Sequence, residues 1–216
     1  MRELLVGRDF FGVHPWETLG EFEVESLKLK VGEELRSKLL ANPAAGVGEI
    51  GLDRLKVRDI PPLMREVFES QLALALELRR PVVLHGAKCW GQVVTTVCRH
   101  LSLSSTPPLP HSPTPSFLFH GFSRSDGLIP DIVKLNGFIS VGPAVLNDHA
   151  VNYRELVKKI PLDRLLVETD AVVGARVPTR PHIRDVLVKT ADILNLSAAE
   201  LEKTTDENAD RFLGAV

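Results

Sequence analysis

Cysteine is scarce in this chain, which excludes a disulfide-stabilised scaffold. The 216 residues contain only Cys89 and Cys98, and their spacing does not form a Cys-x-x-Cys pair. Small domains held together by disulfides carry more cysteines at closer spacing. We therefore expect both thiols to be free.

Long apolar runs and a strong net charge are also missing. No apolar run approaches the roughly 20 residues that a bilayer-spanning helix needs, and the first residues lack the charged-then-apolar layout of a signal peptide. We expect a soluble intracellular protein without membrane contact, in the cytoplasm or the nucleus. Because the formal net charge is only -2, a sequence-specific DNA-binding module is not expected. Any contact with nucleic acid would depend on a local patch or a bound metal.

The chain does have the composition and length of one globular domain, with 44% hydrophobic and 25% charged residues. We expect this domain to span residues 1–216. Short apolar runs alternate with helical patterns. Strands are predicted from Leu4–Val6 into a loop at 10–16, and at 45–50, 81–85, 117–120, 137–141 and 165–169. Helices are predicted over 21–40, 61–78, 90–101, 128–135, 152–159, 182–194, 198–204 and 207–213.

Strands that alternate with helices predict parallel pairing through right-handed crossovers, in an α/β fold of the TIM-barrel type. We count six strands, whereas a closed barrel needs eight and about 250 residues. The barrel is therefore expected to be incomplete. The Ser/Pro-rich segment at about 102–116 cannot form a helix or a central strand, and we interpret it as an exposed insertion within the domain.

Side chains that can bind metal recur at the ends of the predicted strands. Glu49 lies in a short apolar run flanked by glycines, where an unpaired carboxylate would be costly to bury. His85, His120 and Asp170 each close a later apolar run. In a parallel barrel these strand ends lie on one face, where active sites of this architecture are built. The pattern predicts a metal centre.

Six motifs in this order resemble the TatD family of metal-dependent deoxyribonucleases, within the amidohydrolase-like metal-dependent hydrolases. They extend over nearly the whole chain, and six in order are far more specific than any one. The motifs are Gly12-Val13-His14-Pro15-Trp16, Gly48-Glu49-Ile50-Gly51-Leu52-Asp53, Pro81-Val82-Val83-Leu84-His85, His120-Gly121-Phe122, Leu166-Val167-Glu168-Thr169-Asp170-Ala171 and Thr204-Thr205-Asp206-Glu207-Asn208-Ala209.

The resemblance implies a barrel hydrolase with up to two divalent metals acting on a phosphodiester. Glu49 would bridge the metals, and His85 and His120 would bind one of them. Asp170 would bind the other and orient the attacking water, while His14 would contact a substrate phosphate. Arg124 and Lys88 lie just beyond ligand strands and are candidates for holding phosphate oxygens. Ligands of this kind suit Zn, Mn or Co, and occasionally Mg.

The chain departs from the family pattern at its start. Family members open with an Asp-x-His-x-His motif on a first strand, whereas the first histidine here is His14. The resemblance then leaves one site complete in protein ligands and the other with only Glu49 and Asp170. We expect one firmly bound metal and a second that is weak or absent. The exposed sheet edge leaves three explanations open: a truncated chain, a divergent open barrel, or a homodimer or protein partner that covers the gap.

The favoured function is a deoxyribonuclease that cleaves DNA phosphodiesters through a metal-activated water. Two alternatives stay open: a weakly active or inactive scaffold that serves as a protein-interaction partner, and a hydrolase with a substrate other than nucleic acid. Among the remaining residues, Glu168 is interpreted as a structural partner of a buried basic group. Trp16 and Trp90 are interpreted as packing or rim residues, with stacking on a nucleotide near the mouth of the site left open for either. Asn208-Ala209 are interpreted as structural.

Overall fold

The computed structural model describes residues 9–20, 30–103, 115–169 and 182–214. They form a single sheet of six strands whose spatial order follows the chain. Every adjacent pair is parallel. The predicted α/β class is confirmed, and among the described residues β1 and β6 are the edges of a sheet that does not close. The strands are β1 (Phe10–Phe11), β2 (Gly46–Asp53), β3 (Val82–Ala87), β4 (Phe117–Phe119), β5 (Gly137–Val141) and β6 (Leu165–Val167).

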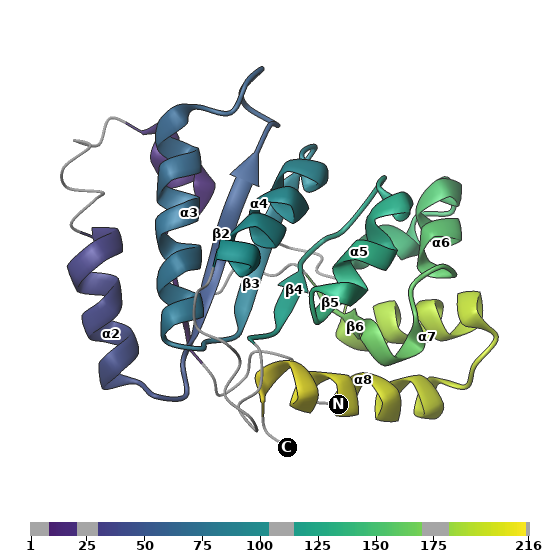
Figure 1. Ribbon diagram of the computed structural model, residues 1–216. Coiled ribbons are helices and arrows are strands. Elements are labelled where there is room, and N and C mark those ends of the chain that lie inside the picture. Colours follow the sequence, from purple (N-terminus) through teal and green to yellow (C-terminus); the bar gives the residue numbers. More distant parts are fainter. Residues whose placement is uncertain (1–8, 21–29, 104–114, 170–181, 215–216) are drawn as a thin grey trace.

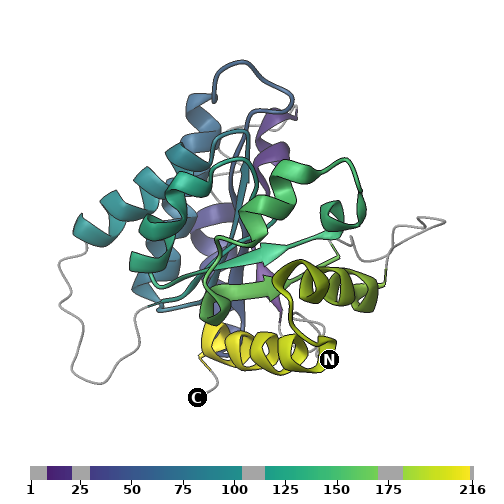
Figure 2. The same cartoon turned by 90° about the vertical axis from the view of Figure 1, so that its right-hand side faces the viewer.

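Helices follow the strands and cover the sheet. The α3, α4 and α5 helices stand along one side of it, and α8 crosses beneath the strands (Figure 1). The α7 and α8 helices lie side by side (Figure 2). None of the described helices is long and apolar enough to cross a membrane. The helices are α2 (Leu35–Ala41), α3 (Pro62–Glu77), α4 (Trp90–Leu103), α5 (Ile129–Lys134), α6 (Val151–Val157), α7 (Ile183–Leu194) and α8 (Ala198–Leu213), with short turns η1 (Pro15–Leu19), η2 (Lys30–Glu34), η3 (Asp126–Leu128), η4 (Pro143–Leu146) and η5 (Leu162–Arg164).

Both faces of the sheet are buried, which explains why its strands are continuous apolar runs. Neighbouring strand residues point to opposite faces. One set, including Leu84 and Phe119, packs into the large core with the surrounding helices. The opposite set packs against the end of α8 in a smaller cluster of Val83, Leu118, Phe138, Leu166, Ala209 and Phe212. The α8 helix thereby fills the inner side of the curved sheet.

The β2 strand is longer than predicted. The sequence predicts that this strand ends at residue 50, but pairing with β3 continues through Asp53. Gly51 makes this continuation possible, because it pairs with His85 at φ +150°. A β-carbon at that position would lie 2.0 Å from the carbonyl oxygen of His85. Glu49 and Asp53 therefore lie on one strand.

The last helix is continuous where two helices were predicted. The hydroxyl groups of Thr204 and Thr205 donate hydrogen bonds to carbonyl oxygens one turn earlier, at Glu200 and Leu201, so the polar run does not interrupt α8. Ser197 caps the start of the helix. At the other end of the chain, the predicted helix over 21–40 is described only from residue 30, as a π-helical turn followed by α2.

Two predicted segments fall largely or wholly outside the described residues. The predicted strand at Leu4–Val6 lies outside them, and the first described strand is β1. Most of the Ser/Pro-rich insertion, residues 104–114, lies outside them as well.

Candidate metal centre

The centre of the site is the Glu49 carboxylate, which reaches into a ring of imidazoles. Glu49 comes from β2, His85 from β3, His120 from the residue after β4, and His14 from the loop after β1. Oxygen Oε2 of Glu49 lies 3.9 Å from Nδ1 of His85, 3.9 Å from Nε2 of His120 and 4.0 Å from Nε2 of His14. Parallel strands place these residues together because their carboxyl ends share one edge.

His85 has the tautomer of a metal ligand. Its Nε2 lies 2.8 Å from Oδ2 of Asp53. Burial acts to raise the pKa of Asp53, but hydrogen bonds from the Leu55 amide, His85 and Trp16 hold that pKa below its ordinary value. Because an ionised carboxylate can only accept hydrogen bonds, Nε2 of His85 carries the proton. Its Nδ1 lone pair then faces Glu49 and is free to bind a cation.

His120 is oriented in the same way, through its other ring nitrogen. Nδ1 lies 2.5 Å from Oε2 of Glu168. Glu168 also accepts hydrogen bonds from the Gly121 amide, at 2.9 Å, and from the hydroxyl of Ser140. With three donors directed at this carboxylate, His120 donates from Nδ1 and presents the Nε2 lone pair to Glu49.

His14 differs from the other two histidines. Its Nδ1 accepts a hydrogen bond from the Trp16 amide at 3.1 Å, so the proton of the neutral ring is on Nε2. Burial and the neighbouring His85 lower the pKa of His14 to about 4, which keeps the ring neutral at neutral pH. Nε2 is therefore a hydrogen-bond donor directed into the site. This protonation suits an oxyanion better than it suits a metal.

The residues present fit a divalent ion. Side chains of His14, Glu49 and His85 each place one potential ligand atom within 4.8 Å of the others. The hydrogen bonds change which histidines are the better ligand candidates. They leave a lone pair directed at Glu49 on His85 and on His120, whereas the nitrogen of His14 that faces Glu49 carries a proton. One carboxylate with two neutral imidazoles, each held by a second carboxylate, is a typical donor set for Zn or Mn.

Asp53 is the functional candidate that the sequence analysis missed. Its side chain is completely buried, and it joins His85 to the indole Nε1 of Trp16, which donates to Oδ2 at 2.8 Å. The available signal was a carboxylate in an apolar run four residues after Glu49. Glu168 was expected to be a structural partner of a basic group, and its position beside His120 agrees with that interpretation.

The structure does not bring the other predicted site residues into contact with Glu49 among the residues it describes. Asp170 lies outside the described residues. Lys88 is exposed in the turn between β3 and α4. Arg124 is exposed and lines a cavity of about 1130 Å³ that opens beside Glu168. The substrate contacts of Lys88 and Arg124 stay predictions.

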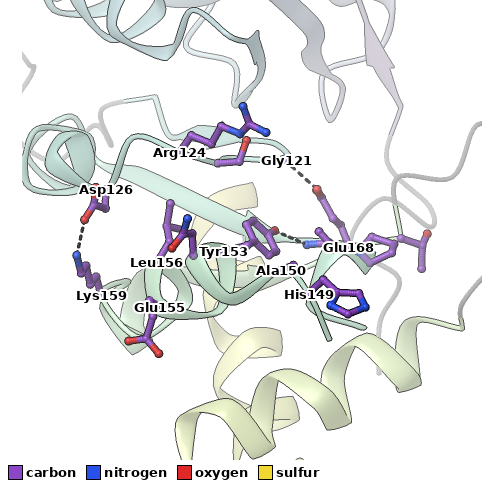
Figure 3. Close-up of a pocket in the computed structure, with 16 residues that line it drawn as sticks. Gly121, Arg124, Asp126, His149, Ala150, Tyr153, Glu155, Leu156, Lys159 and Glu168 are labelled. Atoms are coloured by element: carbon purple, nitrogen blue, oxygen red, sulfur yellow. Dashed lines mark hydrogen bonds and ion pairs between the residues drawn. The ribbon is translucent and has the colours of Figure 1, made fainter. Parts of the chain in front are cut away.

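That cavity extends the site across the ends of β4, β5 and β6 (Figure 3). Gly121 and Glu168 form the side nearest the metal centre, and their hydrogen bond is drawn in Figure 3. Farther along the wall, Lys159 forms an ion pair with Asp126. The cavity is large enough for an extended substrate to leave the metal centre along this wall.

Neither cysteine has the setting of a catalytic nucleophile. Burial raises the pKa of Cys89 to about 11, and its thiol donates to the carbonyl oxygen of Leu52 at 3.2 Å. Burial also raises the pKa of Cys98. Both are free thiols, as predicted.

Solved structures with this fold come from bacteria and eukaryotes. YjjV, a TatD homologue from Escherichia coli K12, superposes with a TM-score of 0.74 at 27% sequence identity, over 97% of this chain and 77% of YjjV. A TatD family hydrolase from Entamoeba histolytica superposes with a TM-score of 0.68 at 19% identity, over 95% of this chain and 74% of that chain. These matches confirm the barrel fold.

Curated relatives match over much of the chain. The metal-dependent hydrolase YabD of Bacillus subtilis is 29% identical over 172 residues, which are 77% of this chain and 64% of YabD. This match therefore spans less than two thirds of that relative. The 3'-5' ssDNA/RNA exonuclease TatD of Pectobacterium atrosepticum is 28% identical over 211 residues, covering 93% of this chain and 75% of that enzyme.

A family model described as TatD related DNase matches residues 8–214, which include all four strand-end ligand candidates. The chain therefore belongs to the TatD family of metal-dependent hydrolases.

Proposed function

We propose that this protein is a metal-dependent nuclease that hydrolyses phosphodiester bonds in DNA. The observation that carries the proposal is the arrangement of Glu49 with His85 and His120, each imidazole being turned by a buried carboxylate so that a lone pair faces Glu49. Such a centre suits a divalent cation.

Glu49, His85 and His120 would hold the firmly bound ion. Asp170, with Glu49, is proposed to hold a second ion more weakly, because two carboxylates without imidazoles form a poorer site for Zn or Mn. When bound, a divalent ion supplies positive charge for the phosphoryl oxygens and promotes ionisation of the attacking water. Zn, Mn and Mg are the candidates.

The chain's own residues would position the substrate. His14 presents Nε2–H to the site and would donate a hydrogen bond to a non-bridging phosphoryl oxygen. Arg124, on the cavity wall, would hold a neighbouring phosphate, and Lys88 would add positive charge beyond β3. Asp170 would orient the attacking water.

The choice of DNA as substrate is supported by the relatives. The Pectobacterium relative is named a 3'-5' ssDNA/RNA exonuclease, while YabD is named only a metal-dependent hydrolase. A cavity of about 1130 Å³ beside the metal centre suits a polymer better than a small ester. We therefore propose single-stranded DNA as the first substrate to test.

The test is metal analysis by mass spectrometry combined with a nuclease assay on single-stranded DNA with Mn, Mg or Zn. About one equivalent of metal should copurify, and a chelator should abolish cleavage. Glu49→Gln should lose the metal and reduce kcat by about 10²–10³-fold, the scale of removing one charge-stabilising group. The matched control is Glu77→Gln, which removes an exposed carboxylate paired with Arg36 and should leave both readouts unchanged.

Three outcomes would contradict the proposal in different ways. A folded protein that binds no metal and cleaves nothing would favour an inactive scaffold. A protein that binds metal and hydrolyses other esters but not DNA would favour a different substrate. Cleavage that persists in Glu49→Gln would show that the assigned centre is not the active site.

A further inference from the structure

Trp16 is a half-exposed aromatic ring at the metal centre, and it belongs to none of the hydrophobic clusters formed by the described residues. The chain has two tryptophans. Trp90 is only 4% exposed and packs against Phe119 and Phe122 in the core. Trp16 is 45% exposed. Leaving this much of a large apolar ring in water sacrifices stabilisation that burial would give.

The exposed ring is nevertheless held in a fixed place. Its Nε1 donates to Oδ2 of Asp53 at 2.8 Å. Its centroid lies 5.1 Å from that of the His14 imidazole, and the two rings are nearly perpendicular at 78°. The His85 ring is 6.5 Å away. Trp16 is therefore a rigid flat surface directly beside the groups proposed to bind metal and phosphate.

Lys56 places a positive charge against this surface. The loop that rises from the end of β2 toward α3 (Figure 1) carries three exposed basic residues, Arg54, Lys56 and Arg58. The ammonium of Lys56 lies 4.0 Å from the centroid of the Trp16 ring. The ammonium therefore lies over one face of the ring, while 45% of the residue stays exposed. Aromatic platforms beside basic side chains are how proteins bind single-stranded nucleic acid without reading its sequence.

We propose that Trp16 and Lys56 form a nucleotide subsite, in which the indole stacks on the base next to the cleaved phosphodiester and the ammonium pairs with a backbone phosphate. The subsite rests on the proposed function, because it requires a nucleic acid substrate. It lies on the β1 and β2 side of the metal centre, whereas the cavity lined by Arg124 lies on the β4 to β6 side. A strand that occupied both would pass across Glu49.

The alternative role of Trp16 is to hold Asp53 through its indole N–H. Two substitutions separate the roles. Trp16→Phe keeps a ring that can stack but loses the donor to Asp53. Trp16→Gln keeps a side-chain donor but loses the ring. Stacking predicts that Trp16→Gln is the more damaging change, and an anchoring role predicts the reverse order.

The experiment uses metal-loaded protein and two strands of equal length and charge: a short oligothymidylate and an all-abasic strand, both with phosphorothioate linkages that slow cleavage. Binding is measured by anisotropy of labelled strands and by quenching of tryptophan fluorescence. Wild type should prefer the strand with bases and be quenched by it. Trp16→Gln should weaken oligothymidylate binding by about 5- to 100-fold and leave binding of the abasic strand unchanged.

Two further variants sharpen the test. Trp16→Phe should bind oligothymidylate within about threefold of wild type and lose the quenching, since buried Trp90 is then the only reporter. Lys56→Gln should weaken the binding of both strands equally. It should also reduce the slope of the logarithm of the binding constant against the logarithm of the salt concentration by about 0.7. The metal content of every variant is measured as well, and a value equal to that of wild type shows that the metal centre is intact.

Equal loss of affinity for both strands in Trp16→Gln, or a larger loss in Trp16→Phe, would overturn the subsite while leaving the nuclease proposal standing. DNA binding and cleavage in wild type without quenching would do the same. If folded, metal-loaded wild type neither bound nor cleaved DNA, the proposed function would fall, and the subsite with it.

Discussion

At the scale of single residues, the site is defined by which nitrogen of each histidine carries a proton. His85 and His120 present opposite ring nitrogens to Glu49, and each has its other nitrogen on a carboxylate. Nδ1 of His14 instead accepts a hydrogen bond from the backbone amide of Trp16. The same residue type can therefore act as a metal ligand at two positions and as a hydrogen-bond donor at a third.

Replacing Asp53 by asparagine tests this assignment. If the amide N–H₂ of the variant faces Nε2 of His85, the ring must move its proton to Nδ1 and lose the lone pair directed at Glu49. We expect Asp53→Asn to raise the Kd for Zn or Mn by about 10- to 100-fold, as for other groups that orient a metal ligand. Calorimetric titration measures the affinity, and nitrogen-15 spectra of the imidazoles report the tautomer.

The control for this prediction is Glu77→Gln, which also neutralises one carboxylate but lies in an exposed pair with Arg36. Its metal affinity should equal that of wild type. An unchanged affinity in Asp53→Asn, with the His85 tautomer unaltered, would show that the negative charge of Asp53 is not needed to orient His85.

At the scale of elements, glycines in β2 allow β3 to approach closely at the metal centre. Gly48 and Gly51 both face β3, and a β-carbon at either position would collide with it. The two strands can then pair through Asp53, which brings that carboxylate to His85. The glycines of the motif around Glu49 are thus a packing requirement as well as a sequence signature.

Gly51→Ala tests this requirement. The new methyl group would have to push the His85 carbonyl away, at a backbone φ of +150° that disfavours a side chain. We expect the free energy of unfolding to fall by about 2–4 kcal/mol, measured by urea denaturation. Gly91→Ala is the matched control, since a β-carbon there meets nothing within 4 Å. That change, in α4, should be neutral or stabilising by up to about 1 kcal/mol.

The α8 helix is tied to β6 by one buried side chain. Asn208 is fully buried, and its Nδ2 donates at 2.7 Å to the carbonyl oxygens of Leu162 and Leu165. Asn208→Ala should lower the free energy of unfolding by about 2–3 kcal/mol, because it removes both of these hydrogen bonds. Glu207→Ala, an exposed change on the same helix, should stay within about 0.5 kcal/mol. Similar denaturation curves for the two variants would contradict this role for Asn208.

At the scale of the whole molecule, the metal centre exists only when the sheet is assembled. The residues proposed to hold the metal come from β2, β3 and the end of β4, and the carboxylate behind His120 comes from the end of β6. The unfolded chain cannot bring these groups together. A metal that binds here must therefore stabilise the native state by mass action.

Thermal unfolding measures this coupling. With metal at about 100 times its Kd, the native state gains about 2.7 kcal/mol. For a chain of this size the Tm should rise by about 5–10 °C. Glu49→Gln should show almost no rise, whereas Glu77→Gln should respond like wild type. An equal rise in Glu49→Gln would show that the metal binds elsewhere.

The sequence by itself determined the order of elements and most of the residues that meet at the candidate metal centre. A chain in which apolar runs alternate with helical patterns can adopt only a few folds. Candidate metal ligands at the strand ends can be identified from the same pattern. Glu49, His85 and His120 could therefore be predicted to meet. The family resemblance, carried by six short motifs, added His14 as a phosphate contact, and the fold comparisons confirmed the barrel.

Only the tertiary structure decided the rest. The length of β2 depends on how closely Gly51 approaches His85, and local sequence does not encode that distance. The roles of Asp53 and Glu168 depend on hydrogen bonds to histidines 32 and 48 residues away in the chain. A carboxylate's function is set by the partner it reaches in space, and for these two carboxylates that partner is brought by a different strand.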